Sequence, residues 1–244
     1  MRLNVVPAAS ALLAASLFSI GLAAPAQAGD RAGFNALGFS TDGRYFAFEE
    51  YGIQDGSGFP YSNIYAIDLP ADKWVAGAPF SVRLDADDSS LAAAREQAMD
   101  LAQPALDTLS LTAPAEMIAH IGDGEPDDGQ VLSFGQPGYG LAEPQNVRTL
   151  SLDTFPLASA STPCADYTDQ PTEGFALLLD GVEFYRDQSL PKSRGCALGY
   201  RIHAVVTPFQ GGLREPATVA IISVYPFGFE GPDRRFIAVP IDTP

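Results

Sequence analysis

The stretch 34–69 constrains the fold of this chain more than any other, because it combines apolar segments with strong turn signals. Residues 34–39 and 44–51 are rich in apolar and aromatic side chains, and Ser-Thr-Asp-Gly separates them at 40–43. Asp-Gly between two such segments is a strong short-range signal for a β-hairpin. A glycine-rich loop then precedes a third segment of this kind at 63–69. We therefore predict three consecutive antiparallel strands.

The rest of the chain is also dominated by strand-like segments. Eight more have the length and apolar pattern of strands: 80–84, 115–121, 147–152, 174–179, 182–185, 200–206, 217–225 and 235–239. Asp180-Gly181 predicts a second hairpin. The segment 217–225 is almost continuously apolar, which is typical of a central strand covered on both faces. We predict a mainly β fold, with two packed antiparallel sheets of about eleven strands.

One segment has helical periodicity instead. Four apolar residues fall on one face of it: Leu91, Ala94, Ala98 and Leu101. Asp88, Ser89 or Ser90 can cap its N-terminus, which explains the acidic residues before it without a cation site. We predict one principal helix near 89–103 that covers an open end or edge of the sheets. Pro104 should end or kink it.

The N-terminus has the pattern of a secretory signal peptide. Arg2 precedes an apolar run, and Ala26-Gln27-Ala28 resembles a cleavage site. We predict a signal peptide at 1–28 and a single exported domain at 29–244, located in the periplasm or outside the cell. This domain would comprise a meander at 29–84, a helical part at 85–110 and a β region at 111–244. No later apolar run is long enough for stable membrane insertion.

The net charge of the chain restricts the classes of molecule that it can bind. The chain has 30 acidic and 14 basic residues, with a formal net charge of −16 at pH 7. Nucleic acid and anionic membranes are therefore poor partners. A solubilising surface explains the acidic residues, and the remaining alternative is a cation or a basic partner.

The two cysteines, Cys164 and Cys196, are expected to form a disulfide, because an exported chain meets an oxidising environment. A zinc site would need further ligands, and neither histidine has the required spacing. The disulfide would tie the loop before the second hairpin to the loop after it.

The best cation candidate is the loop 122–129. Its carboxylates could bind calcium through hard oxygen atoms: Asp123, Glu125, Asp127 and Asp128. The spacing of a calcium-binding EF-hand is missing, so an ordinary turn is the alternative. Calcium is the one cofactor that the sequence leaves open.

The most unusual polar segment is 227–236, which places two arginines among aromatic and acidic residues. The ligand-binding candidates are Glu230, Asp233, Arg234 and Arg235. Paired arginines can hold an anionic ligand by forked hydrogen bonds. They can equally form internal ion pairs with acids of the chain, which is common in loops.

No catalytic set is recognisable. Gly38-Phe-Ser-Thr-Asp42 lacks the second glycine of a serine hydrolase elbow, and Pro191 disfavours a helix for Ser189-Leu-Pro-Lys192. Glu49 and Glu50 should point to opposite faces of a strand, so they cannot act together as a glycosidase pair. We interpret His120 and His203 as structural.

Several stretches together resemble a known family. Residues 37–52, 63–65, 190–196 and 229–240 resemble the bacterial predicted secreted proteins of domain of unknown function 2259. The resemblance implies export and no particular activity. Residues 39–48 with 63–69 are also similar to one blade repeat of TolB-type β-propellers, but the repeat occurs once, and a propeller needs at least four blades.

These observations favour a non-catalytic binding or interaction protein of the cell envelope, whose partner is an envelope protein or a small ligand. The alternative is a cell-envelope hydrolase with an acidic, divalent-cation-dependent site. A binding protein should bring aromatic and arginine residues together at a loop surface. A hydrolase should have a deep pocket with two or more carboxyl groups of shifted pKa.

Overall fold

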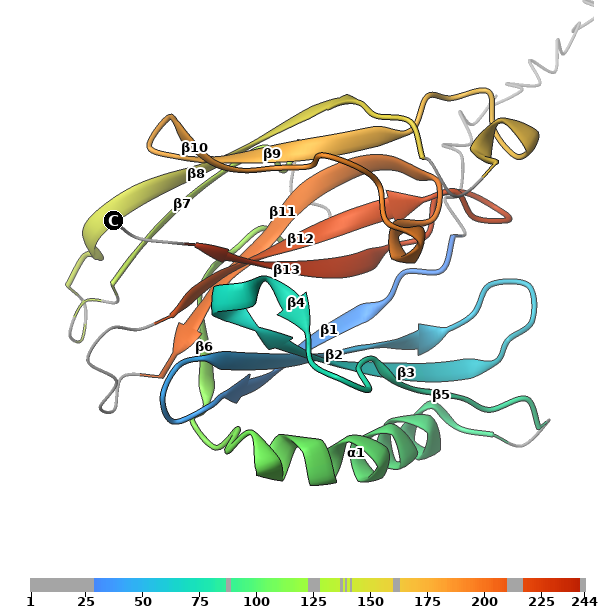
Figure 1. Ribbon diagram of the computed structural model, residues 1–244, viewed down its shortest axis with the longest axis horizontal. Helices are drawn as coiled ribbons and strands as arrows, with labels where there is room; N and C mark the ends of the chain where they lie inside the picture. Colours follow the sequence, from blue (N-terminus) through green and yellow to red (C-terminus); the bar gives the residue numbers. More distant parts are fainter. Residues whose placement is uncertain are drawn as a thin grey trace, which may run out of the picture.

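The computed structural model describes residues 29–86, 89–122, 128–136, 138, 140, 142–159, 163–209 and 217–241. These residues form thirteen β-strands, one α-helix and three short 3-10 helices. The strands make three antiparallel sheets (Figure 1). The prediction of a mainly β fold with antiparallel sheets and one principal helix is confirmed. The sheets number three rather than two, because side-chain patterns identify strands but not their partners.

The first sheet is the predicted meander with a short additional strand. Its strands are β1 Gly33–Phe39, β2 Tyr45–Ile53, β3 Pro60–Asp68, β4 Lys73–Trp74 and β5 Phe80–Arg83. β1, β2, β3 and β4 lie in that order, and β5 also pairs with β3. In the predicted hairpin turn, the backbone N–H of Tyr45 donates to Ser40 Oγ at 2.8 Å, and Gly43 has a φ of 73°. β4 was not predicted, because two residues are too few to show a pattern.

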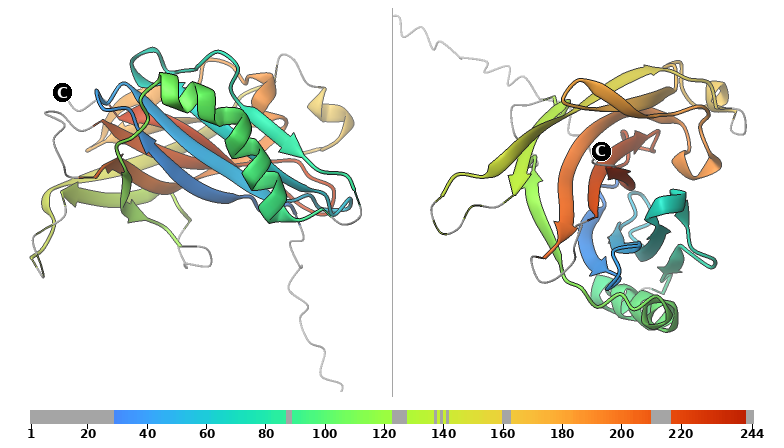
Figure 2. Two further views of the ribbon diagram at one scale, coloured as in Figure 1. Left: turned by 90° about the horizontal axis from the view of Figure 1, so that it is seen from below. Right: turned by 60° about the vertical axis from the view of Figure 1, so that its left-hand side comes forward.

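The helix, α1 Leu91–Thr108, begins as predicted but extends beyond 103. Ser90 caps it by accepting a hydrogen bond from the backbone N–H of Ala93 at 3.1 Å. Pro104 lies inside the helix instead of ending it, because Ala102 and Leu106 are buried against the first sheet. The helix covers a face of that sheet, not an end or edge (Figure 2). Leu101, predicted on the buried face, is 53% exposed.

The second and third sheets contain the remaining strands. The second has the order β10, β9, β8, β7, and the third has the order β13, β12, β11, β6. Their bounds are β6 Ala115–His120, β7 Val131–Gln136, β8 Gln145–Pro156, β9 Glu173–Leu179, β10 Val182–Arg186, β11 Ala197–Pro208, β12 Thr218–Pro226 and β13 Arg235–Ile241. The 3-10 helices are η1 Leu69–Ala71, η2 Cys164–Asp166 and η3 Lys192–Arg194.

The third sheet lies between the other two (Figure 1). Ile222 and Val224 of β12 belong to the core shared with the second sheet, whereas Val219 and Ile221 belong to the core shared with the first. Both faces of β12 are therefore covered, as the apolar run predicted.

The predicted disulfide between Cys164 and Cys196 is present, with a Cα–Cα distance of 5.5 Å. It joins η2, which precedes β9, to the residue before β11. Among the described residues, no helix has the length and apolarity needed to cross a membrane. The predicted signal peptide at 1–28 lies outside the described residues.

Candidate functional site

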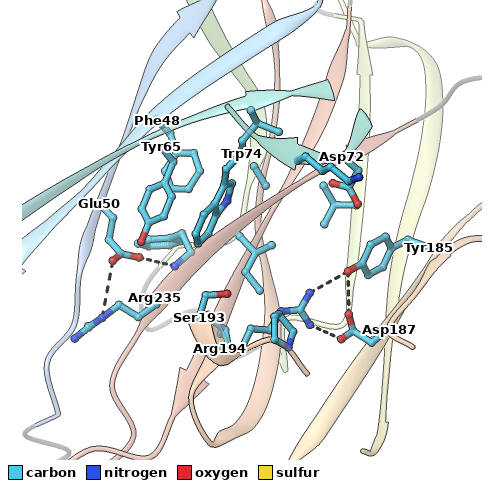
Figure 3. Close-up of a pocket in the computed structure, with 18 of the residues that line it drawn as sticks. Phe48, Glu50, Tyr65, Asp72, Trp74, Tyr185, Asp187, Ser193, Arg194 and Arg235 are labelled. Atoms are coloured by element: carbon cyan, nitrogen blue, oxygen red, sulfur yellow. Dashed lines mark hydrogen bonds and ion pairs between the residues drawn. The ribbon is translucent and has the colours of Figure 1, made fainter. Parts of the chain in front are cut away.

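A pocket of about 800 Å³ lies where edges of the three sheets converge. β4, β10 and β13 each end the strand order of their sheet, and all three contribute to its walls. The turn after η1 and the loop between β10 and β11 complete it. We call it the inter-sheet pocket, and its walls include Trp74, Asp72, Tyr185, Ser193, Arg194 and Arg235 (Figure 3).

Three aromatic rings form one wall of the pocket. Phe48 of β2 and Tyr65 of β3 are directly paired across the two strands, and their rings stack with centroids 4.8 Å apart. The ring of Tyr65 also contacts that of Trp74 on β4, with centroids 5.4 Å apart. Trp74 is 47% exposed and is the single tryptophan of the chain. The three rings therefore run from the buried Phe48 to the accessible indole of Trp74.

A buried carboxylate connects β2 to β13 beside these rings. Glu50 is 1% exposed, and its Oε2 accepts a hydrogen bond from the backbone N–H of Phe236 at 2.8 Å. Its Oε1 accepts one from Asn63 Nδ2 at 3.3 Å and lies 3.9 Å from Arg235 Nε. Burial raises the pKa of Glu50, although the Phe236 N–H and Arg235 oppose the shift.

Arg235 continues this network away from the pocket. Its Nη2 lies 2.7 Å from Asp30 Oδ2 and 3.4 Å from Asp233 Oδ2. Its guanidinium is 5.2 Å from the ring centroid of Tyr61, whose hydroxyl donates to Asp30 at 3.0 Å. Arg235 is thus held by several carboxylates and an aromatic face.

A second buried network stands at the other end of the pocket. Asp187 forms an ion pair with Arg194, and it accepts hydrogen bonds from the hydroxyl of Tyr185 at 2.9 Å and the backbone N–H of Phe175 at 3.0 Å. Arg194 also donates to the hydroxyl oxygen of Tyr185 at 2.9 Å. Burial raises the pKa of Tyr185 to about 12, so this hydroxyl stays protonated. Figure 3 shows the three side chains pointing toward one another.

The mouth of the pocket carries exposed polar side chains. They come from the turn after η1, from β4 and from the loop between β10 and β11: Asp72, Lys73, Gln188, Ser189 and Ser193. Partial burial raises the pKa of Asp72, whereas the nearby charge of Arg194 lowers it. The site therefore combines an aromatic wall, two ionic networks with internal partners and a polar rim.

The structure places the four residues predicted to bind a ligand in different surroundings, although Arg235 and Asp233 lie 3.4 Å apart. Arg235 lines the pocket, while Glu230 is exposed in the loop between β12 and β13. Arg234 is 7% exposed, and its Nη2 donates to the carbonyl oxygen of Ala32 at 2.8 Å. Asp233 accepts a hydrogen bond from the backbone N–H of Asp30 at 3.0 Å. The internal pairing that the sequence left open is therefore what this loop shows.

The predicted cation loop is described only in part. Asp123, Glu125 and Asp127 lie outside the described residues. Asp128 is exposed and accepts a hydrogen bond from the backbone N–H of Gln130 at 3.0 Å. Within the described part of the chain, no three His, Cys, Asp or Glu side chains form a group that could hold a metal. A calcium site in this loop stays a prediction.

Glu49 and Glu50 do point to opposite faces of β2. Glu49 pairs with Arg95 of α1 at 2.8 Å on the helix side, while Glu50 lines the pocket. His203 packs against the rings of Phe34 and Phe236 at centroid distances of 5.6 and 4.9 Å, in keeping with a structural role.

Most of the inter-sheet pocket was not predicted from the sequence. Trp74 lies on a two-residue strand, Asp72 in the turn after η1 and Ser193 in the short 3-10 helix η3, where periodicity carries no signal. The only available signal was a lone tryptophan directly after a turn.

No curated protein and no solved structure matches this chain significantly. The family model of predicted secreted proteins, domain of unknown function 2259, matches residues 47–242. This range includes β3, β4, β10 and β13 and thus most of the inter-sheet pocket. The chain therefore belongs to the predicted secreted proteins of domain of unknown function 2259.

Proposed function

We propose that this chain is an exported, non-catalytic binding protein that holds a small ligand in the inter-sheet pocket, in the periplasm or outside the cell. The observation that carries the proposal is the pocket itself, which sets a partly exposed aromatic wall opposite polar side chains. Its volume of about 800 Å³ falls in the range of small-molecule sites.

The two ionic networks support binding because they fix the walls in place. Glu50 connects β2 to β13, and Asp187 connects β9 to η3 through Phe175 and Arg194. The disulfide at Cys196 lies two residues from Arg194 and holds the same loop. Walls that are already ordered spare a ligand the entropic cost of ordering them.

The same networks disfavour hydrolysis. A catalytic carboxyl group must touch its substrate, but Glu50 is 1% exposed and Asp187 6% exposed, and each already accepts a backbone hydrogen bond. Asp72 is the observation that favours the alternative, a cell-envelope hydrolase, because it is an exposed pocket carboxyl group with a raised pKa.

The first test is a thermal unfolding screen of the oxidised exported chain with neutral sugars, anionic metabolites, divalent cations and short peptides. The matched variant is Ser189→Tyr, which fills the pocket mouth, and the control is Ser133→Tyr at an exposed position of β7. A ligand at a hundred times its Kd should add about 2.7 kcal/mol of stability, or about 5–10 °C in Tm. The shift should disappear in Ser189→Tyr and persist in Ser133→Tyr.

Two results would count against the proposal. One is the lack of a shift with every compound, which would favour an envelope protein as the partner. The other is turnover of a bound compound that stops in Asp72→Asn while binding persists, which would establish the hydrolase instead.

A further inference from the structure

We propose that the ligand of the inter-sheet pocket is a neutral saccharide, whose ring packs on Trp74 and whose hydroxyl groups bind the polar rim. This inference rests on the proposed function and adds the chemical class of the ligand.

The aromatic wall of the pocket suits the apolar face of a saccharide ring. Trp74 presents an indole that is 47% exposed and makes a tilted contact with the ring of Tyr65, which in turn stacks on Phe48. A saccharide ring has one face of C–H groups with polar hydroxyls around its edge. A half-exposed aromatic face fits such a ring better than a lipid chain, which needs enclosure on all sides.

The three arginines of the pocket walls already have anionic partners, and Lys73 at the mouth is the further cation among the lining residues. Arg194 pairs with Asp187, and Arg186 pairs with Glu183 at 2.5 Å. Arg235 pairs with Asp30 at 2.7 Å. An anionic ligand that used these arginines would have to displace their carboxylates, and the chain as a whole carries a formal charge of −16.

The accessible polar side chains of the rim can form hydrogen bonds with saccharide hydroxyls. Ser189 and Ser193 carry hydroxyls that both donate and accept hydrogen bonds, and Asp72 contributes acceptor oxygens. Saccharide hydroxyls likewise donate and accept, so each can be satisfied at such a rim. Asp72 and Ser193 lie on different elements, and Figure 3 shows both side chains with the indole of Trp74 around the pocket.

The edge of β13 disfavours an extended peptide, which would otherwise suit a pocket at an open sheet edge. The backbone N–H of Phe236 donates to Glu50 and therefore points away from β12. By the alternation of an antiparallel ladder, residues 238 and 240 point the same way, and residue 240 is a proline without an N–H. Two of the three N–H positions that an added strand would use on β13 are thus unavailable.

The experiment titrates the oxidised chain with cellobiose, maltose and chitobiose, and separately with galacturonate, inorganic phosphate and an extended hexapeptide. Because Trp74 is the only tryptophan, its fluorescence reports directly on the pocket. Calorimetry then measures affinity in Trp74→Phe and Trp74→Ala, with Phe229→Ala as a control at an aromatic residue that is 83% exposed.

We expect a saturable change of Trp74 fluorescence with at least one neutral saccharide. Trp74→Ala should weaken its binding about tenfold or more, Trp74→Phe less, and Phe229→Ala not at all. Pocket binding of phosphate, galacturonate or the peptide in place of the saccharides would overturn this inference and leave the proposed function intact. If neither these compounds nor the wider screen bind the pocket, both fail.

Discussion

Replacing Asp187 by alanine should destabilise the protein more than any comparable change at the surface. The side chain is 6% exposed and holds three partners, Arg194, Tyr185 and the N–H of Phe175. The change leaves the charge of Arg194, itself 8% exposed, buried without its carboxylate. Breaking a buried ion pair from one side costs about 3–5 kcal/mol, which is a large part of a stability of about 5–15 kcal/mol.

Two further variants separate charge from shape. Asp187→Asn removes the charge and keeps one oxygen that can accept from Phe175, but it replaces the oxygen that accepts from Tyr185 by an amide donor. Asp187→Ala combined with Arg194→Met removes both charges and should recover part of the stability lost in Asp187→Ala, because no unpaired charge remains. Asp68→Ala, which breaks the exposed pair with Arg44 at 2.7 Å, is the control and should cost much less.

The assay is urea unfolding followed by circular dichroism, with equal m-values required for the comparison. A loss below about 1 kcal/mol for Asp187→Ala would refute the assignment of this pair as a structural wall of the pocket. The assignment would also be refuted if Arg194→Met lowered the free energy of unfolding further in the Asp187→Ala background instead of recovering part of it.

Three other outcomes follow from the structure. Reducing the Cys164–Cys196 disulfide, which spans a sequence separation of 32, should lower the free energy of unfolding by about 3.7 kcal/mol in the loop-entropy model. Calorimetry with and without reductant measures this loss of stability, and an unchanged Tm would contradict the expectation. Burial raises the pKa of Glu50 above its ordinary value of 4.5, so the stability that this group contributes is present below that pH and is lost as pH rises through the raised pKa. Urea unfolding between about pH 4 and about pH 8, which starts near the ordinary carboxyl pKa and extends above it, should therefore show wild type losing stability relative to Glu50→Gln as pH rises, and the opposite trend would refute the direction. Ser90→Ala removes the cap of α1 and should cost about 1 kcal/mol, whereas Ser89→Ala should not.

Most strands and both hairpin turns were predictable because their signals are local, whereas β4 and β7 Val131–Gln136 were not predicted. Asp42-Gly43 and Asp180-Gly181 marked both hairpins, and the apolar run of β12 indicated burial on two faces. The end of the helix was not predictable in this way. Pro104 is a strong local stop signal, but burial of Ala102 and Leu106 against the first sheet outweighs it.

The division into three sheets and the pocket between them depend on contacts far apart in the sequence. Trp74, Arg194 and Arg235 belong to three different parts of the chain and meet only because three sheets end at one place. The arginine loop was noticed for its composition, but its role could not be read from composition. Only the structure shows that Arg235 is held by Asp30 and Glu50.

The position of Glu50 connects the fold to the proposed function. An open sheet edge beside a cavity attracts another strand, either from the same chain or from a partner. Phe236, Ala238 and Pro240 are the alternate residues of β13 that face away from β12. Glu50 accepts the N–H of Phe236, and Pro240 has no N–H. Ala238, between these two residues, is 6% exposed. The edge is therefore blocked by a side chain while Trp74 on β4 stays accessible. This combination disfavours an added strand at β13 and supports the proposal that the pocket holds a small ligand.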